Sequence, residues 1–204
     1  MIVFKFLLLI SVVAIEASHF NGGSISWTPV NPNTNGTTVI ITIIQSYSWV
    51  LSEVDCKNNV PITTSGREGE NENLICIAGC GNDGGYSTKM IDVLTDCVSS
   101  SPSLDMMKSQ RARNVTLNIG AYFTVAFQDG NWRDLENVDN DKDWSITSLI
   151  DLRRRPDGLI NTPPVSNVAS PQYVIVNRWT QIAIPVSDAN QGDDVRCRWA
   201  RKSG

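Results

Sequence analysis

Short runs of β-branched and aromatic residues, separated by Gly, Pro, Asn and Asp, dominate this chain of 204 residues. The clearest run covers 121–128, where Phe123, Val125 and Phe127 alternate with small or polar residues. Successive side chains of a strand point to opposite faces, so a period of two collects these aromatic and aliphatic groups on one face. A helix would need a period of 3.6, which this run does not have. The pattern therefore restricts the fold to β-sheets.

Comparable runs predict nine strands, at 24–30, 37–47, 74–77, 115–119, 121–128, 144–152, 173–176, 180–187 and 194–199. The segment 87–97 fits either a short helix capped by Ser87 or Thr88 or a strand that ends at Cys97. Many short strands joined by turns indicate an all-β protein, and a β-sandwich is the expected architecture.

The N-terminus has the pattern of a secretory signal. Lys5 precedes an apolar run at 6–15, and the small residues suited to signal peptidase follow up to Ser18. A membrane anchor is the alternative, but a span needs about 20 apolar residues, and this run is shorter and closes with Glu16. We predict a signal peptide at 1–17, no transmembrane segment in the chain, and a secreted protein that is held at the cell surface if its full-length form carries an anchor.

Export changes the reading of the cysteines. Cys56, Cys76, Cys80 and Cys97 form an even set within about 40 residues, and in an oxidising compartment such a set favours disulfide bonds. Four cysteines allow three pairings, and the sequence leaves all three open. A zinc site is the alternative, although the paired CxxC spacing of zinc ribbons is missing.

Two triplets fit the N-glycosylation pattern, Asn35-Gly-Thr37 and Asn114-Val-Thr116. A bulky glycan requires its asparagine to face solvent. Both asparagines are therefore expected to lie away from any buried face.

A domain boundary is expected near residue 157. A turn at Pro156-Asp-Gly158 precedes the linker-like Asn161-Thr-Pro-Pro-Val165, whose consecutive prolines favour an extended chain. The expected first domain is a disulfide-stapled β-sandwich at 19–156. The remaining 160–204 is too short for a sandwich of about 100 residues. The fifth cysteine, Cys197, lies in this part; we expect its partner beyond Gly204, and an intermolecular bridge or a free thiol is the alternative.

The second part carries a resemblance. The linker 161–165, the turn Val186-Ser-Asp-Ala-Asn-Gln-Gly-Asp193 and the segment 195–199 resemble the opening half of a cadherin-like or immunoglobulin-like extracellular repeat. This implies a partial β-sandwich of that kind at 160–204. Together with 18–27 and 151–155, the chain is similar to uncharacterised secreted or surface-anchored multidomain proteins of invertebrates. That similarity implies no established activity.

The sequence gives little basis for catalysis or for nucleic-acid binding. His19 is the single histidine and lies beside the expected cleavage site, where a chain end is usually mobile and holds no oriented catalytic partner. Motifs of hydrolases, metalloproteases and nucleotide-binding enzymes are missing. The formal net charge of −4 offers no attraction to a phosphate backbone. We therefore predict a protein that is not an enzyme and does not bind nucleic acid.

An acidic loop is the best candidate for an ion site. Asp139, Asp141 and Asp143 alternate as in calcium loops, because Ca²⁺ takes several oxygens from a short stretch of chain. Ile150 stands where the bidentate Glu would be expected, and a solvated hairpin loop is the alternative.

A second candidate combines Asp188, Asn190 and Asp193, residues that also make ordinary Asx turns. Calcium is the only cofactor that these two groups suggest.

Two functions follow from these observations. The favoured one is a non-enzymatic extracellular module for adhesion, recognition or matrix organisation, forming the N-terminal part of a longer secreted or anchored protein. The alternative is a secreted lectin-like protein that binds glycans through an exposed tryptophan and the loop 139–143, with or without Ca²⁺. The ligand, an extracellular protein or a glycan, is not identified by the sequence.

Overall fold

The computed structural model describes residues 19–60, 73–130, 132–133, 143–166 and 172–198. The signal peptide expected at 1–17 lies outside these residues. The described strands are β1 (Phe20–Pro29), β2 (Thr38–Val50), β3 (Ile75–Ala78), β4 (Asp96–Ser101), β5 (Met106–Asn118), β6 (Tyr122–Asp129), β7 (Trp144–Asp151), β8 (Val165–Ser166) and β9 (Val186–Ser187). Three short 3₁₀ helices are η1 (Cys80–Asn82), η2 (Tyr86–Thr88) and η3 (Pro102–Leu104). The all-β class predicted from the sequence is confirmed.

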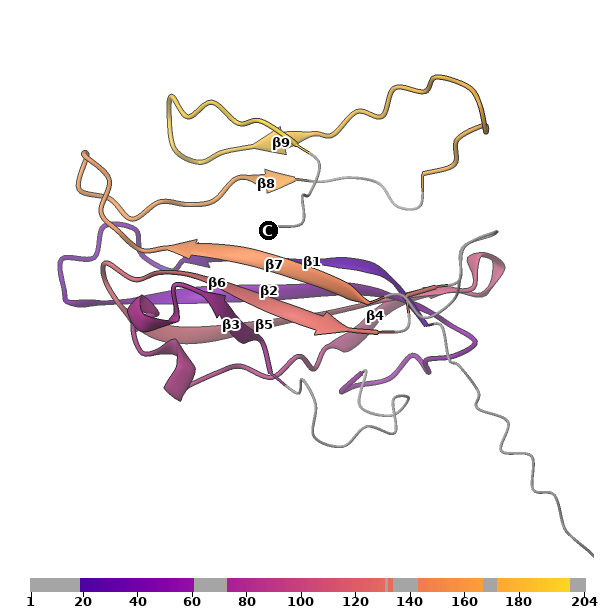
Figure 1. The fold of residues 1–204 in the computed structure, drawn as a ribbon, viewed down its shortest axis with the longest axis horizontal. Helices are drawn as coiled ribbons and strands as arrows, with labels where there is room; N and C mark the ends of the chain where they lie inside the picture. The colour runs from indigo at the N-terminus through magenta and orange to yellow at the C-terminus, as the bar shows by residue number, and fades with distance from the viewer. Residues whose placement is uncertain (1–18, 61–72, 131, 134–142, 167–171, 199–204) are drawn as a thin grey trace, which may run out of the picture.

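All strand pairs in the described residues are antiparallel and form separate sheets (Figure 1). One sheet has the order β1-β2-β5-β4, a second has the order β3-β6-β7, and β8 pairs with β9 alone. The longest pairing joins β2 to β5 without a register shift, from Thr38 opposite Asn118 to Val50 opposite Met106. This pairing forms the centre of the first sheet.

Side chains of the two larger sheets meet in one apolar core. On β6, Phe123, Val125 and Phe127 are buried, as the period-two pattern predicted. They face the buried side of β2, where the ring of Tyr47 lies 5.2 Å from that of Phe127, centroid to centroid. Buried aromatic pairs at this spacing add to the free energy gained by burying their area. The two sheets therefore stabilise each other through their alternating faces.

An aromatic cluster closes one end of this core. Phe20 stacks on Trp144, with ring centroids 3.7 Å apart, and meets Trp49 edge to face at 5.0 Å. His19 is also buried and stacks on Trp49, with centroids 5.6 Å apart. The expectation of a mobile end at His19 was therefore wrong. Packing against Trp49, and a hydrogen bond from the Val50 amide to the His19 carbonyl, hold it in place.

Several strand predictions require correction. None of 173–185 or 194–198 has a strand assignment, and β9 covers only two residues of the expected 180–187. β-branched residues suit a strand, but a strand also needs a partner for its backbone groups, and the described residues supply none here. Conversely, β4 and the first half of β5 are too polar to be recognised from sequence, and pairing along β2 and with each other makes them strands.

The four clustered cysteines form two disulfide bonds, Cys56–Cys97 and Cys76–Cys80, with Cα–Cα distances of 5.2 and 5.8 Å. The spacing had left three pairings open. The first bond joins the segment after β2 to β4, whereas the second closes a loop between β3 and η1. The alternative, a zinc site built from these cysteines, is thereby removed.

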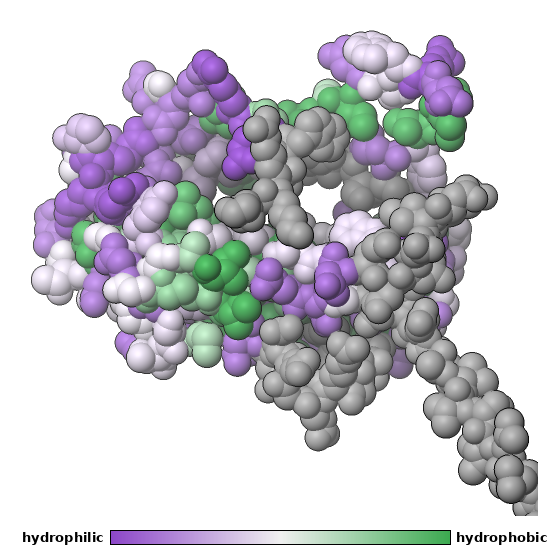
Figure 2. All heavy atoms as spheres, in the orientation of Figure 1, coloured by the Kyte–Doolittle hydropathy of each residue, from purple (hydrophilic) through white to green (hydrophobic). Residues whose placement is uncertain are grey.

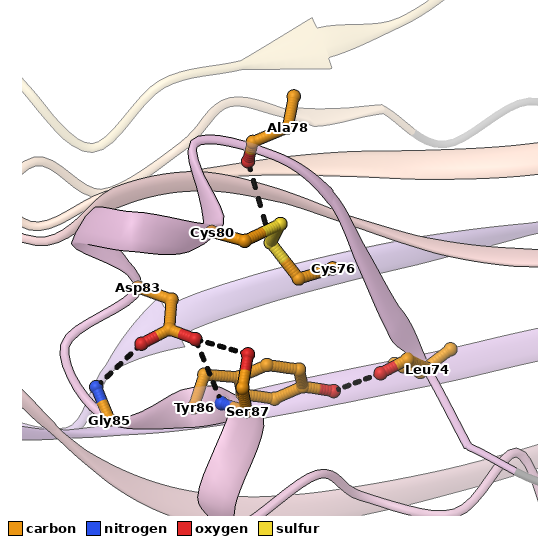
Figure 3. The surroundings of a disulfide bond; sticks show 8 residues. All are labelled: Leu74, Cys76, Ala78, Cys80, Asp83, Gly85, Tyr86 and Ser87. Carbon is orange, nitrogen blue, oxygen red and sulfur yellow. Dashed lines mark hydrogen bonds between the residues drawn. A yellow bond between two sulfur atoms is a disulfide. The ribbon is translucent and has the colours of Figure 1, made fainter.

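Two polar clusters hold the loops around these bonds. Beside the Cys76–Cys80 bond, the Asp83 carboxylate accepts hydrogen bonds from the Gly85 amide at 2.8 Å and from the amide and hydroxyl of Ser87 (Figure 3). Burial opposes ionisation of Asp83, but these bonds outweigh it, and its pKa lies below the ordinary value. Nearby, burial raises the pKa of Tyr86 to about 12.

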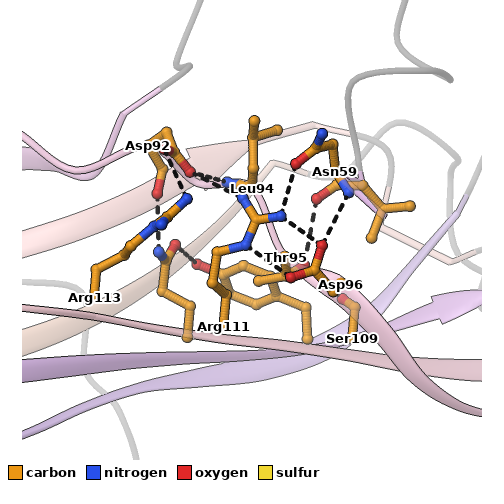
Figure 4. A network of polar contacts seen from close by, with 11 residues as sticks. Asn59, Asp92, Leu94, Thr95, Asp96, Ser109, Arg111 and Arg113 are labelled. Atoms are coloured by element: carbon orange, nitrogen blue, oxygen red, sulfur yellow. Dashed lines mark hydrogen bonds and ion pairs between the residues drawn. The ribbon is translucent and has the colours of Figure 1, made fainter. Parts of the chain in front are cut away.

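The second cluster surrounds Arg111 on β5 (Figure 4). Its guanidinium donates to both carboxylate oxygens of Asp96, at 3.0 and 2.5 Å, and to the Asn59 side chain at 2.7 Å. Asp92 lies 3.6 Å away on the other side. The hydrogen bond from Arg111 holds the pKa of Asp96 below its usual range. These contacts connect three separate chain segments, which is a structural role.

Candidate recognition surface

Half of the exposed large hydrophobic residues in the described part of the chain lie after Ile160. Ile160 itself is buried in the core, and its amide donates to the Pro32 carbonyl at 3.0 Å. Beyond it, Trp179 is 85% exposed and Tyr173 is 79% exposed. In Figure 2, green apolar side chains lie along the upper right of the molecule, where Figure 1 places this stretch. We call the exposed apolar residues here the apolar arms: Tyr173, Val174, Ile175, Val176, Trp179, Ile182 and Ile184.

The backbone of the apolar arms is unpaired as well. Between 173 and 185, the only backbone–backbone hydrogen bond in the described chain runs from the Arg178 amide to the Ile175 carbonyl, at 3.2 Å. It belongs to a turn in which Asn177 takes a left-handed φ of 60°. Extended apolar segments with unpaired N–H and C=O groups are the kind of chain to which a further strand is added.

Arg155, four residues after the end of β7, holds this part of the chain. Its guanidinium donates to both carboxylate oxygens of Asp193, at 2.7 and 2.8 Å, and to the Asn161 side chain at 2.7 Å. The carboxylate of Asp157 lies 3.5 Å away. The Arg155 guanidinium keeps the pKa of Asp193 below its ordinary value. We call this group the Arg155 clamp.

The clamp engages residues of the second calcium candidate. The Asp193 carboxylate pairs with Arg155, and Asp188 accepts a hydrogen bond from the Asn190 amide at 2.7 Å, as in an Asx turn. The Asn190 side chain accepts from the Thr162 amide at 2.9 Å. These oxygens thus make protein contacts. Within the described ranges, no group of three or more His, Cys, Asp or Glu is placed to hold a metal ion.

The first calcium candidate is only partly visible. Asp139 and Asp141 lie outside the described residues, and Asp143 is exposed immediately before β7. The remaining sequence candidates are all exposed: Cys197 is a free thiol, and Asn35 and Asn114 face solvent.

A hollow of about 520 Å³ lies beside the clamp, lined by Asp151, Arg153, Arg154, Arg155 and Asn161. Its arginines already have partners in the protein. Arg153 pairs with Asp151 through bonds of 2.9 and 2.7 Å, and Arg154 donates to the carbonyls of Gly158 and Thr34. The sequence signal for this arrangement was the run of three arginines between two aspartates, but Thr34 and Asp193, which pair with Arg154 and Arg155, lie far from this run in the chain. The arginines that line the hollow therefore hold the segment after β7 in place.

Comparison of the chain with protein-family models, curated proteins and solved structures finds no match. None of the helices in the described part of the chain is long and apolar enough to cross a membrane.

Proposed function

We propose that this chain is a non-enzymatic extracellular module for recognition, adhesion or matrix organisation, and that it forms the N-terminal part of a longer secreted or surface-anchored protein. The uncovered surface of the apolar arms is the observation that supports the part of the proposal that places this chain in a longer protein. The two disulfide bonds and the antiparallel β-scaffold are consistent with an extracellular location.

The exposure of the apolar arms indicates that another chain segment packs against them permanently. Monomeric soluble proteins rarely expose contiguous apolar patches above a few hundred Å². Each of the seven side chains is at least 45% exposed, and Trp179 reaches 85%. Their backbone is unpaired too, so the fitting partner is a β-strand with apolar side chains. In this proposal the strand comes from a continuation of the same polypeptide, which completes the partial module at 160–204.

The proposal is tested by measuring the mass of the protein as it is naturally secreted. An antibody raised against the recombinant chain is used to isolate the secreted protein from its source for mass spectrometry. We expect a species heavier than the 22.4 kDa of this chain, with peptides that continue beyond it. A secreted species with only the mass of the processed chain and its glycans would overturn the longer-protein proposal. The recombinant chain alone serves as the mass reference.

A lectin-like function is the second candidate, and the exposure of Trp179 favours it. An indole that is 85% exposed offers a platform on which a sugar ring can stack. A glycan array tests this with wild-type protein and a Trp179→Ala variant, each with Ca²⁺ and with EDTA. Reproducible binding that is lost in the variant would support the lectin. Loss with EDTA would add a calcium-dependent site. The same weak signal in wild type and variant would exclude Trp179 as the platform.

A further inference from the structure

Asn114 lies on an open stretch of strand β5. β4 pairs with β5 only from Met106 to Gln110, whereas β2 pairs with the whole of β5. From Arg111 to Leu117, β5 thus has β2 on one side and, among the described residues, no paired strand on the other. An open edge of this kind can pair with a strand of another chain and promote aggregation.

Asn114 points away from the core. Its neighbour Val115 is buried, and Asn114 itself is exposed, as the alternation along β5 requires. Across the sheet it lies in register with Thr42, which is in turn opposite Thr28. The Thr42 hydroxyl donates to Oδ1 of Asn114 at 2.8 Å. Oδ1 accepts this bond, and the amide nitrogen Nδ2, on the other side of the group, takes no part in it.

The outer face around Asn114 has almost no charge. The cross-strand rows place Ser24, Ser26 and Thr28 of β1 beside Ile40, Thr42, Ile44 and Ser46 of β2, and these beside Gln110, Ala112 and Thr116 of β5. None of these residues is ionisable, and Ile40 is an exposed apolar side chain. Proteins normally keep such faces and edges apart with charged side chains. The outer face lacks them around Asn114, and the charged residues of the open edge, Arg111 and Arg113, are paired with Asp92 and Asp96.

We propose that an N-linked glycan on Asn114 supplies the missing protection, covering the outer face of the first sheet and the open edge of β5. This inference depends on the extracellular location in the proposed function. In the modification, a lipid-linked oligosaccharide pyrophosphate is the donor. A bond forms between Nδ2 and the anomeric carbon of the sugar, the bond from that carbon to the pyrophosphate oxygen breaks, the amide nitrogen loses one proton to base, and the lipid pyrophosphate leaves. Partners of the protein then bind elsewhere than on this face.

The experiment uses the full chain, expressed in a eukaryotic secretory cell line and collected from the medium. Asn114→Gln and Thr116→Ala both destroy the acceptor triplet, whereas Thr116→Ser preserves it. Asn35→Gln removes the other triplet, which lies in the loop between β1 and β2, and is the matched control. Peptide-N-glycosidase treatment followed by peptide mass spectrometry reports which asparagine carried a glycan.

We expect a glycosidase-sensitive mass on Asn114 in the wild type and in Thr116→Ser, and its loss in the other two triplet variants. By light scattering, the mass of Asn114→Gln and of Thr116→Ala should rise at least twofold over that of Asn35→Gln, because the edge is uncovered. A secreted, folded protein with unmodified Asn114 would overturn the glycan proposal and leave the extracellular location standing. Triplet variants that associate no more than Asn35→Gln would do the same. A chain that is never exported would instead contradict the extracellular location.

Discussion

Arg155 and Asp193 lie 38 residues apart in sequence, yet the guanidinium of one makes two hydrogen bonds with the carboxylate of the other. This pair connects the segment that follows β7 to the turn that follows β9. We predict that Arg155→Ala releases the chain after Ile160, which limited trypsin digestion will detect as faster cleavage at Arg178 and Arg196. The unfolding midpoint of the first domain should stay nearly unchanged.

Arg153→Ala is the control for this prediction, because Arg153 pairs with Asp151 only two residues away. Equal cleavage rates in both variants would show that the Arg155 clamp does not hold the segment.

The second prediction concerns acid. The hydrogen bond from Arg111 depresses the pKa of Asp96 in the folded protein. A carboxyl group with a depressed pKa adds stability above its unfolded value of about 3.9, and this contribution is lost as pH falls toward the folded pKa. Urea unfolding should therefore show Asp96→Asn to be less stable than wild type at pH 7, with a difference that narrows below about pH 4. Asp55→Asn, which removes an exposed ion pair with Lys57, should change stability little at either pH.

The third prediction separates the two disulfide bonds. Cys56–Cys97 spans 41 residues and Cys76–Cys80 spans four. The loop-entropy relation then assigns about 4 kcal/mol to the first and about 2 kcal/mol to the second. Denaturant unfolding of the two double alanine variants should rank them in this order. The reverse order would mean that local packing around Cys76 and Cys80 outweighs chain entropy.

The fourth prediction tests the backbone of the loop at η1. Gly79 has a φ of 70°, and a Cβ placed there would lie 2.5 Å from the Tyr122 carbonyl oxygen. Gly79→Ala should therefore destabilise the protein by more than the ~1 kcal/mol typical of left-handed strain alone. A Cβ placed on Gly81 would meet no atom within 4 Å, so Gly81→Ala should be close to neutral. Thermal unfolding of the pair measures the difference, and equal midpoints would contradict the prediction.

Features set by neighbouring residues were predictable from the sequence, whereas features set by contacts between distant residues were not. The inward face of β6 was predictable because alternation is a local property, and Phe123, Val125 and Phe127 are buried as expected. The strand at 96–101 was missed because its serines have little β-propensity, and only pairing with β5 makes it a strand. The burial of His19 was also missed, since it depends on Trp49, thirty residues later.

For the candidate surface, too, the residue types were predictable from the sequence and the strand pairing was not. The apolar residues at 173–176 and 182–184 were visible in the sequence and were interpreted as strands. Whether such residues pair depends on a neighbouring chain segment, and the described residues place none beside them. What the sequence described as two β-strands is therefore an uncovered apolar segment.

The sequence by itself determined the β class, the cysteines that form disulfides and the triplets at Asn35 and Asn114, because each depends on residue type and short spacing. Only the tertiary structure decided which cysteines pair, that Asn114 lies on a strand edge left open by the described residues, and that Arg155 meets Asp193. These three relationships join residues or strands that are distant along the chain. Their geometry is set by how the sheets pack, which no local pattern specifies.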